Sequence, residues 1–144
     1  MNEAATLRAV LDALIPPSPE RGMPGAGALG LAEHLLDAVP QLAPVVDPAL
    51  AELERVARDR GAADFASLSP EVRQQLLEGL SEHHPAFLAG VLFQVYQASY
   101  AHPDVLEALG MPPRPPHPLG YEVEADDLCL LEKVRGRGDL YRDV

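Results

Sequence analysis

The chain has 144 residues, one cysteine and a formal net charge of −11, from 22 acidic and 11 basic side chains. A domain of this length can bury enough apolar surface to fold without cross-links, and the lone Cys129 excludes cysteine-rich zinc sites and disulfides within the chain. The negative charge argues against binding to nucleic acid or to anionic membranes, because like charges repel.

The beginning of the chain has neither an export signal nor a membrane anchor. Residues 1–7 lack the basic opening and the apolar core of a signal peptide, and they contain no twin arginine. No apolar run anywhere has the roughly 20 residues that cross a bilayer. These features predict a cytoplasmic protein that does not insert into a membrane, unless a partner carries it elsewhere.

Apolar residues spaced three and four apart predict a first helix over residues 7–15. Pro16 and Pro17 end it, because the residue before a proline disfavours helical angles. The glycine-rich stretch 22–30 follows without the lysine of a phosphate-binding loop or a preceding strand. This stretch is interpreted as a flexible connector.

Two further helices are predicted in the next 30 residues. The second covers about residues 28–39 and is stopped by Pro40, and Gly30 in its first turn indicates either a slightly later start or close packing there. The third runs from Asp47 or Pro48 to Arg60, because Asp47 can cap a helix and proline suits the first helical position.

A short connector with two apolar anchors, Phe65 and Leu68, precedes the fourth helix. Ser69, Pro70 and Glu71 form a helix start, with a capping hydroxyl, a proline and a carboxylate near the positive end of the helix dipole. The fourth helix is therefore predicted from about residue 70 to residue 82.

The fifth helix begins near His84 or Pro85 and is the least polar of the chain, so it is expected at the centre of the body. A short sixth helix over 103–109 starts on a proline and stops at Gly110. No stretch alternates apolar and polar residues as a half-buried strand does. The sequence therefore predicts an all-α, single-domain bundle of five main helices and one short helix.

A Pro-rich, extended C-terminal arm is predicted after this body. The run 112–118 is too rich in proline for helix or sheet, and the following residues are too polar to build a core of their own. We therefore divide the chain into a helical body, 1–110, and an arm, 111–144. Partner-binding anchors are predicted on the arm at Tyr121, Leu128, Leu131, Leu140 and Tyr141. The alternative is an arm that wraps its own body.

No catalytic or metal-binding constellation is recognisable in the sequence. The five histidines form none of the Glu-x-x-His pairs that helical di-metal sites use, and they are interpreted as solvated or capping residues. No serine lies in a nucleophile elbow. We therefore predict no catalytic residues, no metal site and no cofactor bound by this chain.

Two other functions are consistent with the residues. The polar side chains at the end of the fifth helix could line a pocket for a small molecule or a cryptic active site: Gln94, Gln97, Tyr100 and His102. Alternatively, Phe93, Tyr96 and Tyr100 could form the face of a homodimer.

Six segments of the chain also resemble the gluconate 2-dehydrogenase subunit 3 family. They are TLRAVLDALIPP (6–17), GLAEHL (30–35), FASLSPEVRQQLL (65–77), FL (87–88), YAHP (100–103) and PLGY (118–121). The resemblance implies a small, non-catalytic helical subunit that binds a large flavin-dependent dehydrogenase of the glucose-methanol-choline type. It implies that this subunit helps its partner mature or stay stable, with FAD in the partner. The chain departs from the family by lacking the twin-arginine signal that some members have, which favours either a cytoplasmic partner or a divergent member that has lost the dehydrogenase altogether.

Overall fold

The computed structural model describes residues 3–38, 40–120, 122 and 124–138. Within these residues the chain is helical, and β-structure is limited to an isolated bridge between Ser18 and Met23. The predicted all-α class is confirmed. The described part of the chain contains no helix that is long and apolar enough to cross a membrane.

The α-helices are α1 (Glu3–Leu14), α2 (Leu31–Ala38), α3 (Ala43–Asp59), α4 (Pro70–His83), α5 (Pro85–Ala101), α6 (Pro103–Ala108) and α7 (Glu132–Arg135). The 3-10 helices are η1 (Pro19–Arg21), η2 (Ala26–Leu29), η3 (Pro40–Leu42), η4 (Phe65–Ser67) and η5 (Leu128–Leu131).

Helices α1 to α6 correspond to the six predicted helices. Helix α1 begins at Glu3, about one turn before the predicted residue 7, and the starts of α2 and α3 also differ from the prediction. Helix α2 begins at Leu31, because Gly30 adopts a positive φ of 69° and separates it from η2. Val39, assigned to this helix from the sequence, lies outside the described residues.

Helix α3 begins at Ala43 rather than at Asp47, so Pro48 lies inside the helix and Asp47 does not cap it. A proline inside a helix removes the hydrogen bond to the carbonyl four residues earlier. Val46 is buried on the same side as Leu50 and Leu53, so the apolar stripe extends one turn further back than predicted. Burial of Val46 offsets the lost hydrogen bond.

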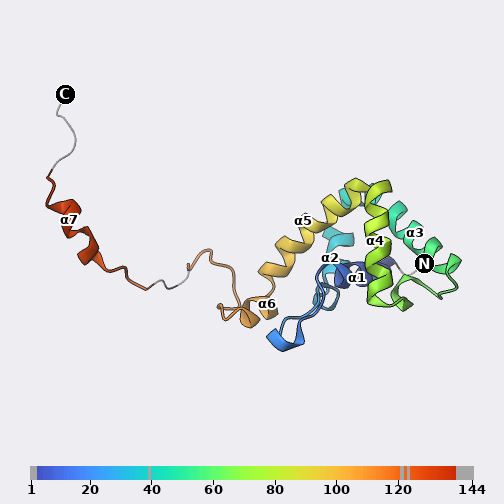
Figure 1. Cartoon of the computed structure of the whole chain (residues 1–144), viewed down its shortest axis with the longest axis horizontal. Helices are drawn as coiled ribbons and strands as arrows, with labels where there is room; N and C mark the ends of the chain where they lie inside the picture. The colour runs from blue at the N-terminus through green and yellow to red at the C-terminus, as the bar shows by residue number, and fades with distance from the viewer. Residues whose placement is uncertain (1–2, 39, 121, 123, 139–144) are drawn as a thin grey trace, which may run out of the picture.

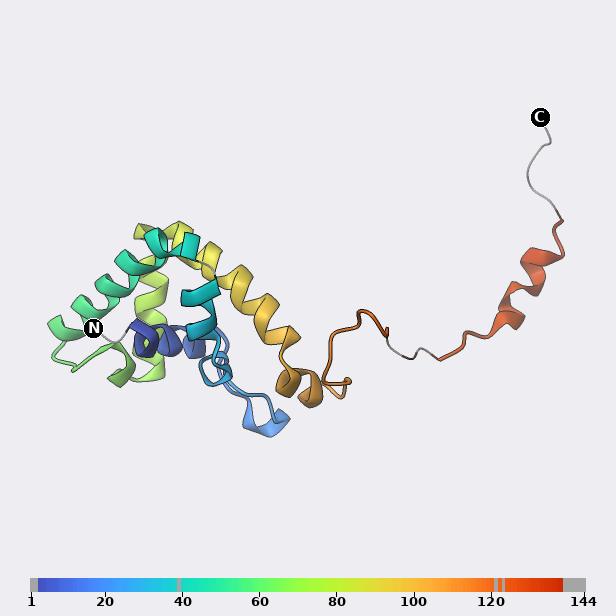
Figure 2. The same ribbon diagram turned by 180° about the vertical axis from the view of Figure 1, so that it is seen from behind.

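Helix α1 lies in the middle of the body and contacts α2, α3 and α4. Figures 1 and 2 show it crossing between α2 and α4. Its buried side chains belong to one continuous core that takes residues from α1 to α5: Leu7, Val10, Leu11, Leu35, Leu50, Leu53, Leu77, Leu80, Phe87, Val91 and Val95.

The glycine-rich stretch is packed against α1 rather than being a plain connector. The backbone N–H of Gly27 donates to Asp12 Oδ1 over 2.8 Å. A Cβ atom at Gly25 would lie 2.4 Å from Asp12 Oδ1, and one at Gly27 would lie 2.4 Å from the carbonyl oxygen of Arg8. Glycine is required here because the backbone approaches α1 too closely for a side chain.

A buried carboxylate joins α1, α3 and η4. Glu54 is 4% exposed, and its Oε1 accepts from the Thr6 hydroxyl over 2.6 Å and from the Phe65 N–H over 3.3 Å. Arg58 Nη1 lies 3.9 Å from Oε2. The contact fixes the connector before α4, where Phe65 is fully buried, as its predicted anchoring role requires.

Helix α5 does not lie at the centre of the body, which corrects the sequence-based expectation. It contacts α2, α3 and α4 with one face only, and that face buries Phe87, Val91, Val95 and Ser99. The opposite face is exposed. Neighbouring helices cover α5 from one side, because the central place is taken by α1 (Figure 1).

The described residues after Gly110 are exposed, apart from the half-buried Arg114 and Gly120. Gly110 has a φ of 73° and ends the last helix of the body. Figures 1 and 2 show the following segment running away from the helices to η5 and α7.

Candidate functional site

Exposed large apolar side chains gather in the C-terminal third of the described chain. In residues 3–38 and 40–92 every described large apolar side chain is buried or half-buried. From Phe93 onward ten are exposed: Phe93, Tyr96, Tyr100, Leu109, Met111, Leu119, Leu128, Leu130, Leu131 and Val134. Large apolar patches on a protein surface mark interaction sites. This segment is therefore the candidate functional site.

The first part of the site is the outer face of α5. We define it by five exposed side chains, Ala86, Ala89, Phe93, Tyr96 and Tyr100; the uncharged Gln97 is exposed next to them. Phe93 is 61% exposed, and the rings of Tyr96 and Tyr100 stack with centroids 6.2 Å apart and an interplanar angle of 11°. Helix α5 contains no charged residue. The face is thus apolar, aromatic and neutral.

The second part of the site is the C-terminal arm. Of the predicted anchors, Leu128 is 59% and Leu131 is 44% exposed, and both lie in η5. The Asp127 side chain starts this turn by accepting from the Cys129 N–H over 3.0 Å. Tyr121, Leu140 and Tyr141 lie outside the described residues.

Charge on the arm is separated along the sequence. Glu122, Glu124, Asp126 and Asp127 precede η5, whereas Glu132 is followed by the three basic residues Lys133, Arg135 and Arg137 after it. A partner surface that binds this segment therefore meets an apolar turn between an acidic and a basic side.

The four residues predicted to line a pocket do not converge on any cavity described here. Gln97 and Tyr100 are exposed, and Gln94 is half-buried. The His102 side chain caps α6, because its Nδ1 accepts from the Asp104 N–H over 3.3 Å. The pocket stays a prediction from the sequence.

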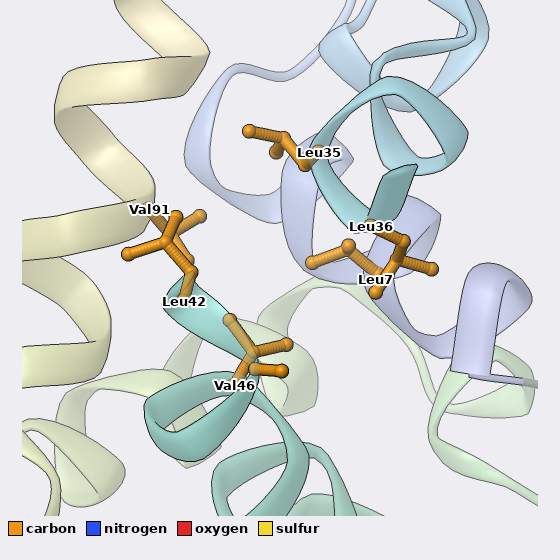
Figure 3. A pocket seen from close by; sticks show the side chains of 7 residues that line it. Leu7, Leu35, Leu36, Leu42, Val46 and Val91 are labelled. Atoms are coloured by element: carbon orange, nitrogen blue, oxygen red, sulfur yellow. The ribbon is translucent and has the colours of Figure 1, made fainter. Parts of the chain in front are cut away.

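One cavity in the core is small and is lined by apolar side chains. It has a volume of about 20 Å³ and is surrounded by core side chains from α1, α2, η3, α3 and α5, as Figure 3 shows: Leu7, Leu35, Leu36, Leu42, Ala43, Val46 and Val91. That volume is close to the space of one water molecule, and the lining offers no polar side chain to hold it. This cavity cannot bind an organic ligand.

A larger groove follows the end of α1 along α4. Two adjoining hollows of about 460 and 360 Å³ share Ala13 and Pro16 in their walls. Ser81 lines the groove, but its hydroxyl donates to the Glu78 carbonyl over 2.6 Å, and the Glu78 carboxylate accepts from the Gln74 side chain over 3.3 Å. Arg73 lines the other end, and its Nε is buried without a partner in the described chain. The groove has no arrangement for nucleophilic catalysis.

The histidines make structural contacts: His83 and His102 bind backbone atoms within their own segment, whereas His84 reaches a residue of another helix. His84 Nε2 lies 2.8 Å from Glu52 Oε2, a contact that ties the junction of α4 and α5 to α3. His83 Nδ1 lies 3.2 Å from the Gly79 carbonyl oxygen. Among the described residues no three His, Cys, Asp or Glu side chains come together in a way that could hold a metal ion.

Lowered carboxylate pKa values occur at helix contacts away from the candidate site. The hydrogen bond from Arg8 lowers the pKa of Glu33 and joins α1 to α2. At the start of α4 the backbone N–H of Glu71, followed by the Ser69 hydroxyl, lowers the pKa of Glu71. The Ser18 hydroxyl, then the Glu20 backbone N–H, lowers the pKa of Glu20. These groups stabilise local structure and supply no raised-pKa acid for catalysis.

Comparison with known proteins identifies a family for most of the chain. The model of the family named gluconate 2-dehydrogenase subunit 3 matches residues 1–109. No curated protein and no solved structure matches the chain. The match includes the outer face of α5 and ends before the arm, so the PLGY segment at 118–121 lies outside it. The chain belongs to the gluconate 2-dehydrogenase subunit 3 family.

Proposed function

We propose that this chain is a non-catalytic accessory subunit that binds a large flavin-dependent dehydrogenase subunit and helps it to mature or to stay stable. The family name implies association with a dehydrogenase catalytic subunit. FAD and the catalytic residues belong to that partner in this proposal, and the present chain binds no cofactor.

One observation carries the proposal. Among the described residues the chain buries or half-buries its large apolar side chains up to residue 92, and the ten exposed ones all lie between residues 93 and 134, where Val95, Val105 and Leu106 are buried between them. Apolar surface that the chain does not cover itself favours contact with another protein over catalysis in a pocket.

The arm, residues 111–144, is proposed to bind the partner in an extended form. The prolines of 112–118 limit its conformational freedom, which reduces the entropy lost on binding. Leu128 and Leu131, together with Tyr121, Leu140 and Tyr141, are the proposed anchors. Spaced apolar anchors on an extended segment cover a large surface with few residues.

Recovery of the partner from the native host tests this proposal. The tagged chain is purified from a lysate, the absorbance of the eluate is recorded at the flavin bands, and the proteins are identified by mass spectrometry. A stoichiometric flavin-containing dehydrogenase is expected. Recovery of a colourless chain alone would contradict the proposal and direct attention to ligand binding by the helices.

Truncation of the chain tests how much the arm contributes to partner binding. The variant that ends at residue 110 is expected to stay folded and to lose at least tenfold in recovered flavin per captured chain. The quadruple change of Glu122, Glu124, Asp126 and Asp127 to the corresponding amides is a milder companion that keeps every apolar anchor. Full recovery with the truncated chain would show that the arm does not contribute to binding.

A further inference from the structure

The exposed residues on the outer face of α5 repeat with a regular spacing. Ala86, Ala89, Phe93, Tyr96 and Tyr100 follow one another at intervals of three, four, three and four residues. This is the spacing of the seam by which one helix packs lengthwise against another at a shallow crossing angle. From residue 86 to residue 100 the seam is about 21 Å long.

The side chains on this seam change in size along the helix. Two alanines occupy its N-terminal part, and three aromatic rings occupy the rest. Alanines allow the backbones of two helices to approach closely, whereas aromatic rings need small residues or a hollow opposite them. The seam therefore fits a helix whose large side chains lie opposite the alanines and whose small side chains lie opposite the rings.

Charge on the surrounding surface favours a neutral contact at this face. The chain as a whole has a net charge of −11, yet α5 has no acidic or basic side chain over its 17 residues. A charged side chain buried against this seam would lose its water without gaining an opposite charge. The complementary surface must be apolar.

A second copy of the chain covers too little surface to be the occupant. The three exposed rings offer about 300 Å² if each contributes roughly half of its area. A stable interface needs about 800 Å² on each partner. A symmetric contact across α5 would also leave the apolar side chains of the arm uncovered. One larger partner that receives both α5 and the arm reaches the required area.

We infer that the outer face of α5 is a docking surface for an apolar helix of the dehydrogenase catalytic subunit, packed lengthwise along the 86–100 seam. This inference rests on the proposed function and specifies how the partner is bound. The family match, residues 1–109, contains the whole seam and none of the arm. Helix α5 is thus the docking surface that the family region itself provides, and the arm adds to it.

The primary test replaces Phe93 by lysine. Phe93 is 61% exposed, so Phe93→Lys is expected to fold like the wild type, as checked by circular dichroism and thermal unfolding. Recovered flavin per captured chain, measured over a dilution series of native lysate, is expected to fall at least tenfold, because a buried lysine lacks a charged partner. Tyr100→Lys is a second variant with the same expectation. Gln75→Lys, which adds the same charge to an exposed position of α4, is expected to match the wild type.

A second variant tests whether the occupant is a closely packed helix. Ala89→Phe enlarges the small end of the seam and adds apolar area to it. Close lengthwise packing predicts a several-fold loss of recovered flavin dehydrogenase, because the partner helix cannot approach the larger ring. Unchanged or increased recovery with Ala89→Phe would contradict helix packing along the whole seam.

The outcomes separate this inference from the proposed function. If wild type recovers the flavin dehydrogenase and both lysine variants recover it equally, the inference is wrong and the accessory role stands. If the wild type recovers no dehydrogenase, both the proposed function and this inference are wrong. If light scattering finds a wild-type dimer that Phe93→Lys dissociates, a second copy covers the seam and the inference is wrong.

Discussion

Residues 3–92 and residues 93–138 differ in the solvent exposure of their large apolar side chains. The first region places all that the structure describes into or against one core, whereas the second leaves ten exposed. Both regions contain leucine, valine and aromatic residues, so composition alone does not explain the contrast. The first region thus covers its own apolar surface, whereas the second leaves apolar surface exposed, and this exposed surface is where we propose that the partner binds.

The largest predicted effect compares two phenylalanines, one from each region. Phe65 is fully buried and Phe93 is 61% exposed. Phe65→Ala is expected to lower the free energy of unfolding by about 3–5 kcal/mol, because it leaves a cavity in the core. Phe93→Ala is expected to change it by less than about 0.5 kcal/mol. Urea unfolding of the two variants measures both values, and similar losses would remove the contrast between the regions.

Two glycines of the first region test how closely residues 25–27 are packed against α1. Gly27→Ala is expected to destabilise the fold by about 1–3 kcal/mol, because its Cβ would lie 2.4 Å from the Arg8 carbonyl oxygen. Gly79 has open space around its Cβ position inside α4, so Gly79→Ala is expected to stabilise by about 0.5–1 kcal/mol. Thermal unfolding compares the two. Equal effects would mean that the 25–27 stretch is not packed on α1.

A smaller effect concerns the pH dependence of the first region. The pKa of Glu33 is lowered from its ordinary value of 4.5, chiefly by the hydrogen bond from Arg8. The folded state therefore favours the carboxylate, and this stabilisation is present above pH 4.5 and is lost as the pH falls through the lower folded-state pKa. Glu33→Gln is expected to melt slightly below wild type at neutral pH, with a gap that closes in acid. A gap that stays constant with pH would contradict the assignment.

The smallest expected effect on stability comes from removing the arm. In the described residues after Gly110 no side chain is buried, so the variant that ends at residue 110 is expected to keep the free energy of unfolding of the full chain within about 0.5 kcal/mol. Urea unfolding with the full chain as reference measures this. A large loss would mean that the arm wraps its own body and belongs to the first region.

Much of the fold could be predicted from the sequence because its determinants are local. The order of six helices followed from three local signals: prolines and glycines at the helix ends, the three-and-four spacing of apolar residues, and the Ser69 cap. The start of α3 was missed because Asp47 and Pro48 resemble a helix start. The sequence also offered an earlier start, since Pro44 suits the first turn of a helix and Val46 extends the apolar stripe.

The candidate site was predicted in part. The sequence selected Leu128 and Leu131, which are exposed, and it named Phe93, Tyr96 and Tyr100 as an alternative dimer face. The regular seam that includes Ala86 and Ala89 was not recognised. Nearly every position of α5 is apolar, so its sequence has no polar face to show which side meets the core.

By itself the sequence determined the helical class, the order of the helices and the resemblance to a subunit family, because turn formers, caps and residue spacing act between neighbours in the chain. Only the tertiary structure decided that α1 takes the centre, that residues 25–27 pack on Asp12 and that one apolar face of α5 is left exposed. These outcomes depend on which helices occupy the limited space of the core, and this is decided by contacts between residues far apart in the sequence.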